Sequence, residues 1–308
     1  MQIKKIASID IGTNTLLMLV AEFDCNTNKI LHVIEDHHLI ARLGEGVDLN
    51  KNINENAINR AIDILRFYKM RLIALNVDLV EIVATSALRD AENKEYVCSA
   101  LSKEIGYDIN VVSGEEEARL SYLGTMDLEL SINTLVLDIG GGSSELIYGE
   151  NIDIINRKSF DIGAVRLTER FIKNYPPSFD EIETIRNYIK NMLIGFDLPS
   201  NKYELFSVAG TPTTLAQITL GLDSFVYAKI HNYKMNIYDL MDCIDVLTSN
   251  SKEDLIAKYK IHPSRADILL SGALILDEVI KFTKKDSFFV SCHGLRYGVL
   301  INSISKLS

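Results

Sequence analysis

The sequence has no CxxC pair, no long apolar run and no excess of basic residues. Its cysteines are widely separated, at Cys25, Cys98, Cys243 and Cys292. This spacing argues against a zinc site and against a redox dithiol, so we expect reduced, structural cysteines. Apolar runs such as Leu16 to Ala21 fall short of the roughly 20 residues that a membrane-spanning helix needs.

The charge balance limits the partners that the chain can bind. With 32 Lys and Arg against 42 Asp and Glu, the formal net charge is −10, so a broad basic surface for duplex nucleic acid or an anionic membrane is not expected. A polyanion can still bind locally, through backbone N–H groups, a few arginines and a divalent cation. Met1 to Ile6 contain no apolar signal stretch, so we expect a cytoplasmic protein.

A long internal repeat suggests two α/β domains. Three short strands joined by tight turns open the chain, helices and strands follow, and the same pattern restarts near residue 134. The turns DIGTNT at Asp10 and DIGGGSSE at Asp138 lie 128 residues apart, which is the length of a domain. We therefore predict domains at 1–130 and 131–308, with a short hinge near Asp127 to Asn133. The main helices expected from apolar spacing are Glu55–Leu75, Glu95–Glu104, Gly114 to about Leu130, Asp180–Ile194, Thr213–Leu220, Tyr238–Thr248 and Arg265–Phe282.

Both glycine turns have the chemistry of a phosphate site. Each places a carboxylate at a strand end, then glycines that permit close backbone approach, then hydroxyl or amide side chains. The predicted phosphate-binding residues are Gly12, Thr13, Asn14, Thr15, Gly140, Gly141, Gly142, Ser143 and Ser144. The alternative is a pair of ordinary hairpin turns, but repetition in the same context favours a ligand.

A third glycine turn runs from Ala209 to Thr214, between a predicted strand and a helix start. N–H groups at such a position can face an anion, which makes Gly210 and Thr211 further candidates. An ordinary helix cap with proline at an early helical position explains the same pattern, and the sequence leaves both interpretations open.

The segment SGEEEAR, from Ser113 to Arg119, holds three consecutive carboxylates at a helix start. Ser113 and Glu116 fit a capping box, and acids there complement the helix dipole. Glu117 points about 100° further round the helix than Glu116, so it is available to activate water. A purely structural role for Glu117 remains the alternative.

Other charged residues extend the candidate site. Asp138 and Glu145 flank the second turn, and carboxylates that converge across a hairpin can hold Mg²⁺ or Mn²⁺ together with phosphate oxygens, with Asp10 completing the set. The alternative to a metal site is that Glu145 lies on a solvent-exposed face of its strand. Arg89 lies in a predicted loop directly after a buried strand, where a surface ion pair is the alternative. Arg296 is similarly placed after the last predicted strand.

Seven motifs in order, spanning nearly the whole chain, resemble the exopolyphosphatase and guanosine pentaphosphate phosphohydrolase family. The motifs are DIGTNT at Asp10, RLGEGV at Arg42, ATSALRDAEN at Ala84, SGEEEAR at Ser113, LDIGGGSSE at Leu137, AGTPTTLA at Ala209 and GLR at Gly294.

The resemblance implies an actin-like fold, also called hexokinase-like or Hsp70-like, of two ribonuclease-H-like domains with an interdomain cleft. It implies release of terminal orthophosphate from inorganic polyphosphate, from guanosine pentaphosphate, or from both. Residue by residue, it makes Glu117 the catalytic glutamate and Arg89 a phosphate contact. It also assigns Asp138, Glu145 and Asp10 to metal and phosphate, and it is compatible with a homodimer.

Two departures limit the transfer from the family. Tyr297 follows the GLR motif where many members have an acid. The chain reaches only Ser308, short of the helical domains that extend the polyphosphate channel of longer relatives, so we expect little processivity and a preference for shorter polyphosphates or a guanosine nucleotide. Two rival functions remain: an ATP-dependent phosphotransferase or ATPase of the same fold, and a non-catalytic sensor that signals by domain closure.

Overall fold

The chain folds into two compact units. The computed structural model describes residues 3–27, 29–126, 133–198 and 202–303. Met1–Gly124 and Leu295–Ser308 form the first unit, and Thr125–Gly294 form the second. The predicted boundary at 130/131 and most of the predicted hinge lie outside the described residues. The sequence assigned everything from 131 to 308 to one domain, whereas the structure groups the residues from Leu295 onward with the first unit.

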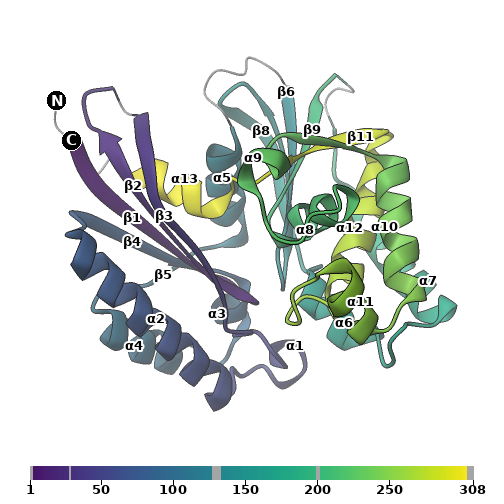
Figure 1. The fold of residues 1–308 in the computed structure, drawn as a ribbon, viewed down its shortest axis with the longest axis horizontal. Coiled ribbons are helices and arrows are strands. Elements are labelled where there is room, and N and C mark those ends of the chain that lie inside the picture. The colour runs from purple at the N-terminus through teal and green to yellow at the C-terminus, as the bar shows by residue number, and fades with distance from the viewer. Residues whose placement is uncertain (1–2, 28, 127–132, 199–201, 304–308) are drawn as a thin grey trace. The chain divides into compact units, whose positions relative to one another are not determined.

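The first unit contains a five-stranded sheet in the order β3-β2-β1-β4-β5 (Figure 1). The first three strands form an antiparallel meander, and β4 and β5 run parallel to β1. The strands are β1 Ile3–Ile11, β2 Thr15–Asp24, β3 Lys29–Ile40, β4 Leu79–Ala84 and β5 Asn110–Val111. This topology is that of a ribonuclease-H-like domain, as the sequence predicts.

Helices α2 (Glu55–Leu75) and α4 (Lys94–Ile105) cover one face of this sheet (Figure 1). Side chains alternate between the faces of a strand, so β1 contributes every second residue, such as Ile9, to the core under these helices. The predicted bounds of α2 are confirmed. Its N-cap Asn54 accepts a hydrogen bond from Ala57 N at 2.9 Å, which satisfies one of the open donors of the first turn.

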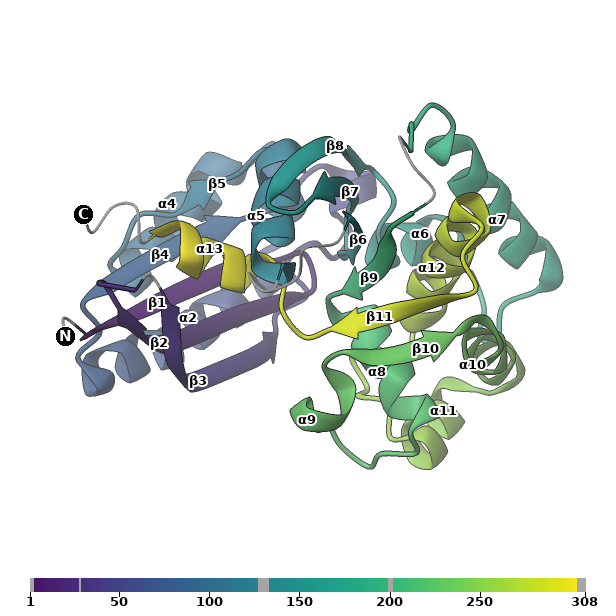
Figure 2. The same cartoon turned by 90° about the horizontal axis from the view of Figure 1, so that it is seen from above.

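The opposite face of the sheet packs against helices α5 (Gly114–Thr125) and α13 (Leu295–Ser303), which lie side by side (Figure 2). Leu300 joins Ile6 of β1 in a buried cluster. A Cβ atom at Gly298 would lie 1.7 Å from the carbonyl oxygen of Leu120, so only glycine allows this approach of α13 to α5. Two short helices complete the unit, α1 (Val47–Asn50) and α3 (Ser86–Asp90).

The second unit repeats the meander and adds one strand. Its sheet has the order β10-β11-β9-β6-β7-β8, in which β6, β9 and β11 are parallel and β10 is an antiparallel edge strand. The strands are β6 Asn133–Ile139, β7 Ser144–Glu150, β8 Asp153–Phe160, β9 Glu204–Val208, β10 Tyr233–Asn236 and β11 Ser287–Ser291. The strands β8-β7-β6-β9-β11 thus repeat the order β3-β2-β1-β4-β5 of the first sheet, and β10 is the added strand.

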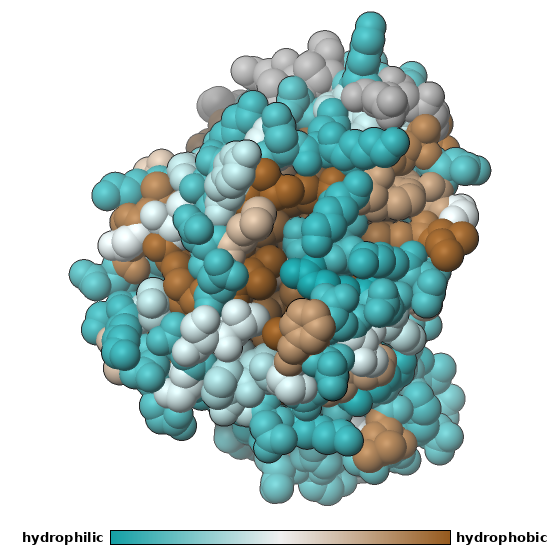
Figure 3. Space-filling model, turned by 90° about the vertical axis from the view of Figure 1, so that its right-hand side faces the viewer, coloured by the Kyte–Doolittle hydropathy of each residue, from teal (hydrophilic) through white to brown (hydrophobic). Residues whose placement is uncertain are grey.

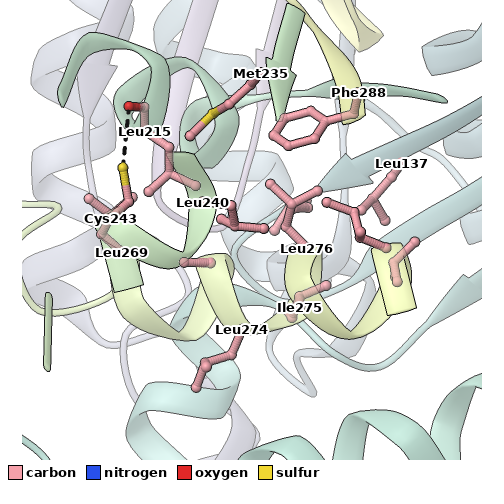
Figure 4. Packing of buried hydrophobic residues seen from close by; sticks show 14 of the residues in the cluster. Leu137, Leu215, Met235, Leu240, Cys243, Leu269, Leu274, Ile275, Leu276 and Phe288 are labelled. Carbon is pink, nitrogen blue, oxygen red and sulfur yellow. Dashed lines mark hydrogen bonds between the residues drawn. The ribbon is translucent and has the colours of Figure 1, made fainter. Parts of the chain in front are cut away.

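One face of this second sheet carries the hydrophobic core (Figure 4). Helix α12 (Leu269–Thr283) is buried along almost its whole length, and Leu276 and Leu137 belong to the same cluster. The remaining helices are α6 Ala164–Phe171, α7 Phe179–Leu193, α8 Gly210–Thr219, α9 Tyr227–Ile230, α10 Ile237–Ser249 and α11 Lys252–Tyr259. Hydrophobic side chains also appear among hydrophilic ones on the surface drawn in Figure 3.

These two units define an α/β protein with an actin-like fold, as predicted. The four cysteines are free thiols, which also agrees with the sequence. Among the described residues, no helix combines the length and the hydropathy needed to cross a membrane.

Candidate functional site

The two DIG turns have the same local geometry. Gly12 N donates to Thr15 O at 3.1 Å, and Gly140 N donates to Ser143 O at 3.0 Å. A Cβ atom at Gly12 or Gly140 would lie 2.9 or 2.8 Å from those same carbonyl oxygens, so each turn requires its glycine. The sequence repeat is therefore a repeat of backbone structure, with one turn in each unit.

The carbonyl groups of the three glycines of the second turn point toward the start of α6. Ala164 N donates to Gly140 O and Val165 N to Gly141 O, both at 2.9 Å, and Arg166 Nε donates to Gly142 O at 2.6 Å. Because the C=O and N–H of a trans peptide are antiparallel, the next three N–H groups point away from α6. They belong to Gly141, Gly142 and Ser143. Such successive amides form a concave anion-binding site.

Two residues that the sequence analysis missed hold this turn in place. Arg166 is only 9% exposed. A Cβ atom at Gly163 would lie 2.4 Å from Gly141 O, so α6 approaches the turn only because residue 163 is a glycine. A glycine before an amphipathic helix, soon after the second meander, was the local signal for this contact.

Hydroxyl and amide side chains of the turns differ in their contacts. Ser144 Oγ and Asn14 Oδ1 are buried and have no hydrogen-bond partner among the described residues, which suits them to accept or donate to a ligand. The Thr13 hydroxyl instead shares a 2.7 Å hydrogen bond with Ser86 Oγ. Asn14 Nδ2 lies 3.4 Å from Thr15 Oγ1.

The RLGEGV motif supports the first turn. Ala41 N and Arg42 N donate to Asn14 O at 3.1 and 2.9 Å, and Gly44 N donates to Thr13 O at 2.8 Å. These contacts direct the carbonyl groups of the first turn toward residues 41–44, as α6 does for the second turn. The RLGEGV motif therefore stabilises the conformation of the DIGTNT turn through these hydrogen bonds.

The carboxylates flanking the second turn are paired across the hairpin, as the sequence predicts. Asp138 lies opposite Glu145, and Glu145 lies opposite Ser159, so all three side chains share one sheet face. Asp138 and Glu145 are 7% and 1% exposed, and Ser159 Oγ donates to Glu145 Oε1 at 2.7 Å. Two buried carboxylates in this arrangement match the donors that Mg²⁺ prefers.

Asp10 belongs to the first unit, where its strand partner is Leu17 rather than an acid. It is 8% exposed. In the part of the chain that the structure describes, no three His, Cys, Asp or Glu side chains form a group that could hold a metal ion. A metal held by Asp138 and Glu145 would therefore need oxygen ligands from substrate or water.

Glu117 forms an ion pair with Arg89. The Arg89 Nη1 atom donates to Glu117 Oε2 at 2.8 Å and to Val112 O at 3.2 Å. Arg89 lies in the short helix α3 rather than in the loop that we predicted. The predicted catalytic glutamate and the predicted phosphate-contacting arginine are thus brought together across 28 positions of sequence, and Glu117 is only 7% exposed.

The neighbouring acid has a different environment. Glu116 N donates to Ser113 Oγ at 3.2 Å, and both Glu116 oxygens accept hydrogen bonds from Arg119 at 2.8 Å. The predicted cap by Ser113 is confirmed, while the Glu116 carboxylate pairs with Arg119 within its own helix. Glu116 and Glu117 therefore have different partners, Arg119 and Arg89, as expected for neighbouring side chains about 100° apart around a helix.

The third turn is the beginning of α8, and it is contacted by an arginine that the sequence analysis did not select. Arg265 Nη1 donates to Gly210 O at 2.7 Å and to Thr214 Oγ1 at 2.8 Å. No carboxylate among the described residues lies within ion-pair distance of it, and burial lowers the pKa of its guanidinium. Thr211 packs instead against Gly272 of α12, where a Cβ atom would lie 2.2 Å from its hydroxyl.

Arg296 has a structural role within the first unit. Its guanidinium donates to both oxygens of Asp36, at 2.9 and 2.8 Å, and its carbonyl accepts from Ser8 Oγ at 2.6 Å. Burial by itself raises the pKa of Asp36, but hydrogen bonds from His38 and Arg296 outweigh it, so the pKa lies well below its usual range. These contacts attach α13 to the sheet.

Two ribonuclease-H-like units with glycine turns at matching strand ends define the class of actin-like phosphate-handling proteins. The chain belongs to the Ppx/GppA phosphatase family, whose model matches residues 2–307. The family and the class of enzyme that the sequence indicated, phosphoanhydride hydrolases, are thereby confirmed.

Individual relatives show which family members the chain resembles. It is 30% identical to exopolyphosphatase 2 of Mycobacterium tuberculosis, over 98% of this chain and 99% of that protein. It is 34% identical to the guanosine-5'-triphosphate,3'-diphosphate pyrophosphatase of Pseudoalteromonas translucida, over 98% of this chain and 59% of that protein. It is 31% identical to a bifunctional 3-dehydroquinate synthase/phosphatase of Fusobacterium nucleatum, over 97% of this chain, but spans only 46% of that relative.

A solved structure with a similar fold is the exopolyphosphatase of Cytophaga hutchinsonii. The TM-score is 0.88 at 28% sequence identity, and the match covers 98% of each chain.

Proposed function

We propose that the protein releases terminal orthophosphate from inorganic polyphosphate, from guanosine pentaphosphate, or from both. The observation that carries this proposal is the buried Glu117 carboxylate held 2.8 Å from the Arg89 guanidinium. The relatives named for exopolyphosphatase and guanosine pentaphosphate pyrophosphatase activity support the choice of substrates.

In this proposal Glu117 orients and deprotonates the attacking water. Arg89 fixes the carboxylate through one oxygen, and a positioned carboxylate is a suitable general base. Arg89 also supplies a positive charge for phosphate oxygens, since guanidinium groups bind phosphate through charge-assisted hydrogen bonds.

The glycine turns bind the phosphate groups. The three N–H groups at Gly141, Gly142 and Ser143 donate to oxygen atoms, and they cost no reorganisation because α6 and Arg166 already orient them. The Ser144 hydroxyl adds a buried polar group at the same turn. Arg265 supplies a positive charge at the third turn, beside Gly210.

Asp138 and Glu145 would hold Mg²⁺ or Mn²⁺. Their burial and shared sheet face fit a cation that takes one or two protein carboxylates and completes its coordination with phosphate oxygens. When bound, the ion neutralises charge on the terminal phosphate. Asp10 is a further candidate ligand for metal or phosphate. We also propose that the protein forms a homodimer, which is compatible with its family.

The decisive experiment measures orthophosphate release, with Mg²⁺, from short polyphosphate, long polyphosphate, guanosine pentaphosphate and ATP in parallel. The Glu117→Gln protein serves as the blank. Release from polyphosphate or the guanosine substrate that disappears in the variant supports the proposal and ranks the substrates. Turnover of ATP alone indicates the phosphotransferase or ATPase, and tight binding with no turnover indicates the sensor.

A further inference from the structure

Three aromatic rings form a layered cluster in the second unit, at Tyr227, His231 and His293. The Tyr227 hydroxyl lies 2.8 Å from His293 Nε2, and their ring centroids are 5.9 Å apart at 26°. A hydrogen bond through the ring edge at this angle places the two rings side by side and nearly coplanar. His231 stacks on both, with centroids 5.0 Å from Tyr227 and 4.2 Å from His293.

The backbone fixes this cluster. Cys292 N donates to His231 Nδ1 at 3.2 Å, and His293 N donates to Ser291 Oγ at 3.1 Å. The rings therefore form a flat surface about two rings wide, supported from one side by His231. Despite this support, Tyr227 remains 43% exposed.

The cluster lies at the same sheet edge as the glycine turns. Ser291 at the end of β11 pairs with Val208 at the end of β9, and Val208 pairs with Asp138 on β6. Parallel strands lie about 4.8 Å apart, so Ser291 is about 5 Å from the start of the third turn and about 10 Å from Asp138. Ligands of open α/β sheets bind at the carboxyl ends of the parallel strands.

We propose that Tyr227 and His293, backed by His231, stack against the base of a nucleotide whose phosphates are bound by the second and third glycine turns. The cluster offers aromatic faces on which a base can stack, and stacking on aromatic side chains is a common mode of base recognition. This inference rests on the proposed function and selects the nucleotide, guanosine pentaphosphate, as a substrate alongside polyphosphate.

The experiment compares the two ligand classes in the Glu117→Gln protein, where binding can be measured without turnover. Calorimetry gives the Kd of guanosine pentaphosphate and of short polyphosphate with Tyr227→Ala, His293→Ala and Tyr227→Phe. Loss of a stacked aromatic ring weakens base binding on the order of 5- to 150-fold. We expect this loss for the nucleotide with both alanine variants, a smaller one with Tyr227→Phe, and a fall in nucleotide-to-polyphosphate selectivity.

Tyr238→Ala is the matched control, because Tyr238 lies on α10 of the same unit and is 74% exposed. It should change neither Kd. An equal loss for both ligands in the Tyr227 variants would overturn the proposal, as would unchanged nucleotide binding. Thermal unfolding of each variant identifies any that fail to fold. If Tyr227→Ala fails to fold, His293→Ala and Tyr227→Phe still test the stacking surface. If the protein with Glu117 intact releases no phosphate from any substrate, but Tyr227→Ala weakens nucleotide binding, the proposed hydrolase function is wrong and the proposed stacking surface is supported.

Discussion

Arg89 and Glu117 form an ion pair of 2.8 Å between helices α3 and α5. Since Arg89 also donates to the carbonyl of Val112, the segment between β5 and α5 fixes the position of the guanidinium. The carboxylate is thereby held in one orientation before any substrate binds, which is the preorganisation that general-base catalysis requires.

Replacing Glu117 by Gln should reduce phosphate release by a factor of about 100 to 10,000, because the amide cannot accept the proton of the water. The amide oxygen can still accept from Arg89, so thermal unfolding should change little. Glu116→Gln is the matched control, one residue away and paired with Arg119; it should remain active. Comparable activity of the two variants would remove Glu117 from the mechanism.

Arg89→Ala should reduce the rate and also weaken phosphate binding, because the variant loses both the support for Glu117 and a cationic donor. Arg89→Lys should recover part of the binding but little of the rate, since an ammonium group cannot reproduce the guanidinium contacts to Glu117 and Val112 together. Separate values of kcat and KM for the three proteins test this. A full recovery by lysine would show that only the charge matters.

Gly163→Ala should disturb the second glycine turn, because its Cβ atom would lie 2.4 Å from Gly141 O. We expect a rise in KM and a loss of about 1 to 3 kcal/mol in the free energy of unfolding, as for other overpacked sites. Gly195→Ala is the control. Gly195 has φ +85° but no neighbour within 4 Å, so its substitution should affect stability without affecting KM.

Asp36→Asn should destabilise the first unit, because it removes the carboxylate that binds Arg296. The loss should lie near the lower end of the roughly 3 to 5 kcal/mol typical of a broken buried pair, since the Asp36 side chain is 24% exposed. The measurement is denaturant unfolding of both proteins at several pH values.

The effect of Asp36 should depend on pH in a defined direction. Its pKa in the folded protein lies below its ordinary value of 3.8, so the stabilisation is complete above that value and is lost as the pH falls through the folded pKa. The difference in the free energy of unfolding between the wild-type and Asp36→Asn proteins should shrink in acid below about pH 4. A difference that grows in acid would contradict the ion pair.

The sequence by itself determined the elements whose causes are local. Each DIG turn needs glycine because a Cβ atom there would lie 2.9 or 2.8 Å from a carbonyl oxygen three residues later. The separation of Glu117 from Glu116 follows from helical geometry. The bounds of α2 were predictable for the same reason, since an N-cap and a regular apolar spacing are contained in one segment.

Only the tertiary structure decided the contacts between distant segments. Arg296 lies 260 residues from Asp36, and Arg265 lies 55 residues from Gly210. The aromatic cluster likewise joins α9 to the end of β11. The sequence assigned α13 to the second domain because it follows the last strand, but buried contacts with β1 and α5 place it in the first unit. Such choices depend on which apolar surfaces bury one another, and local sequence patterns do not record that.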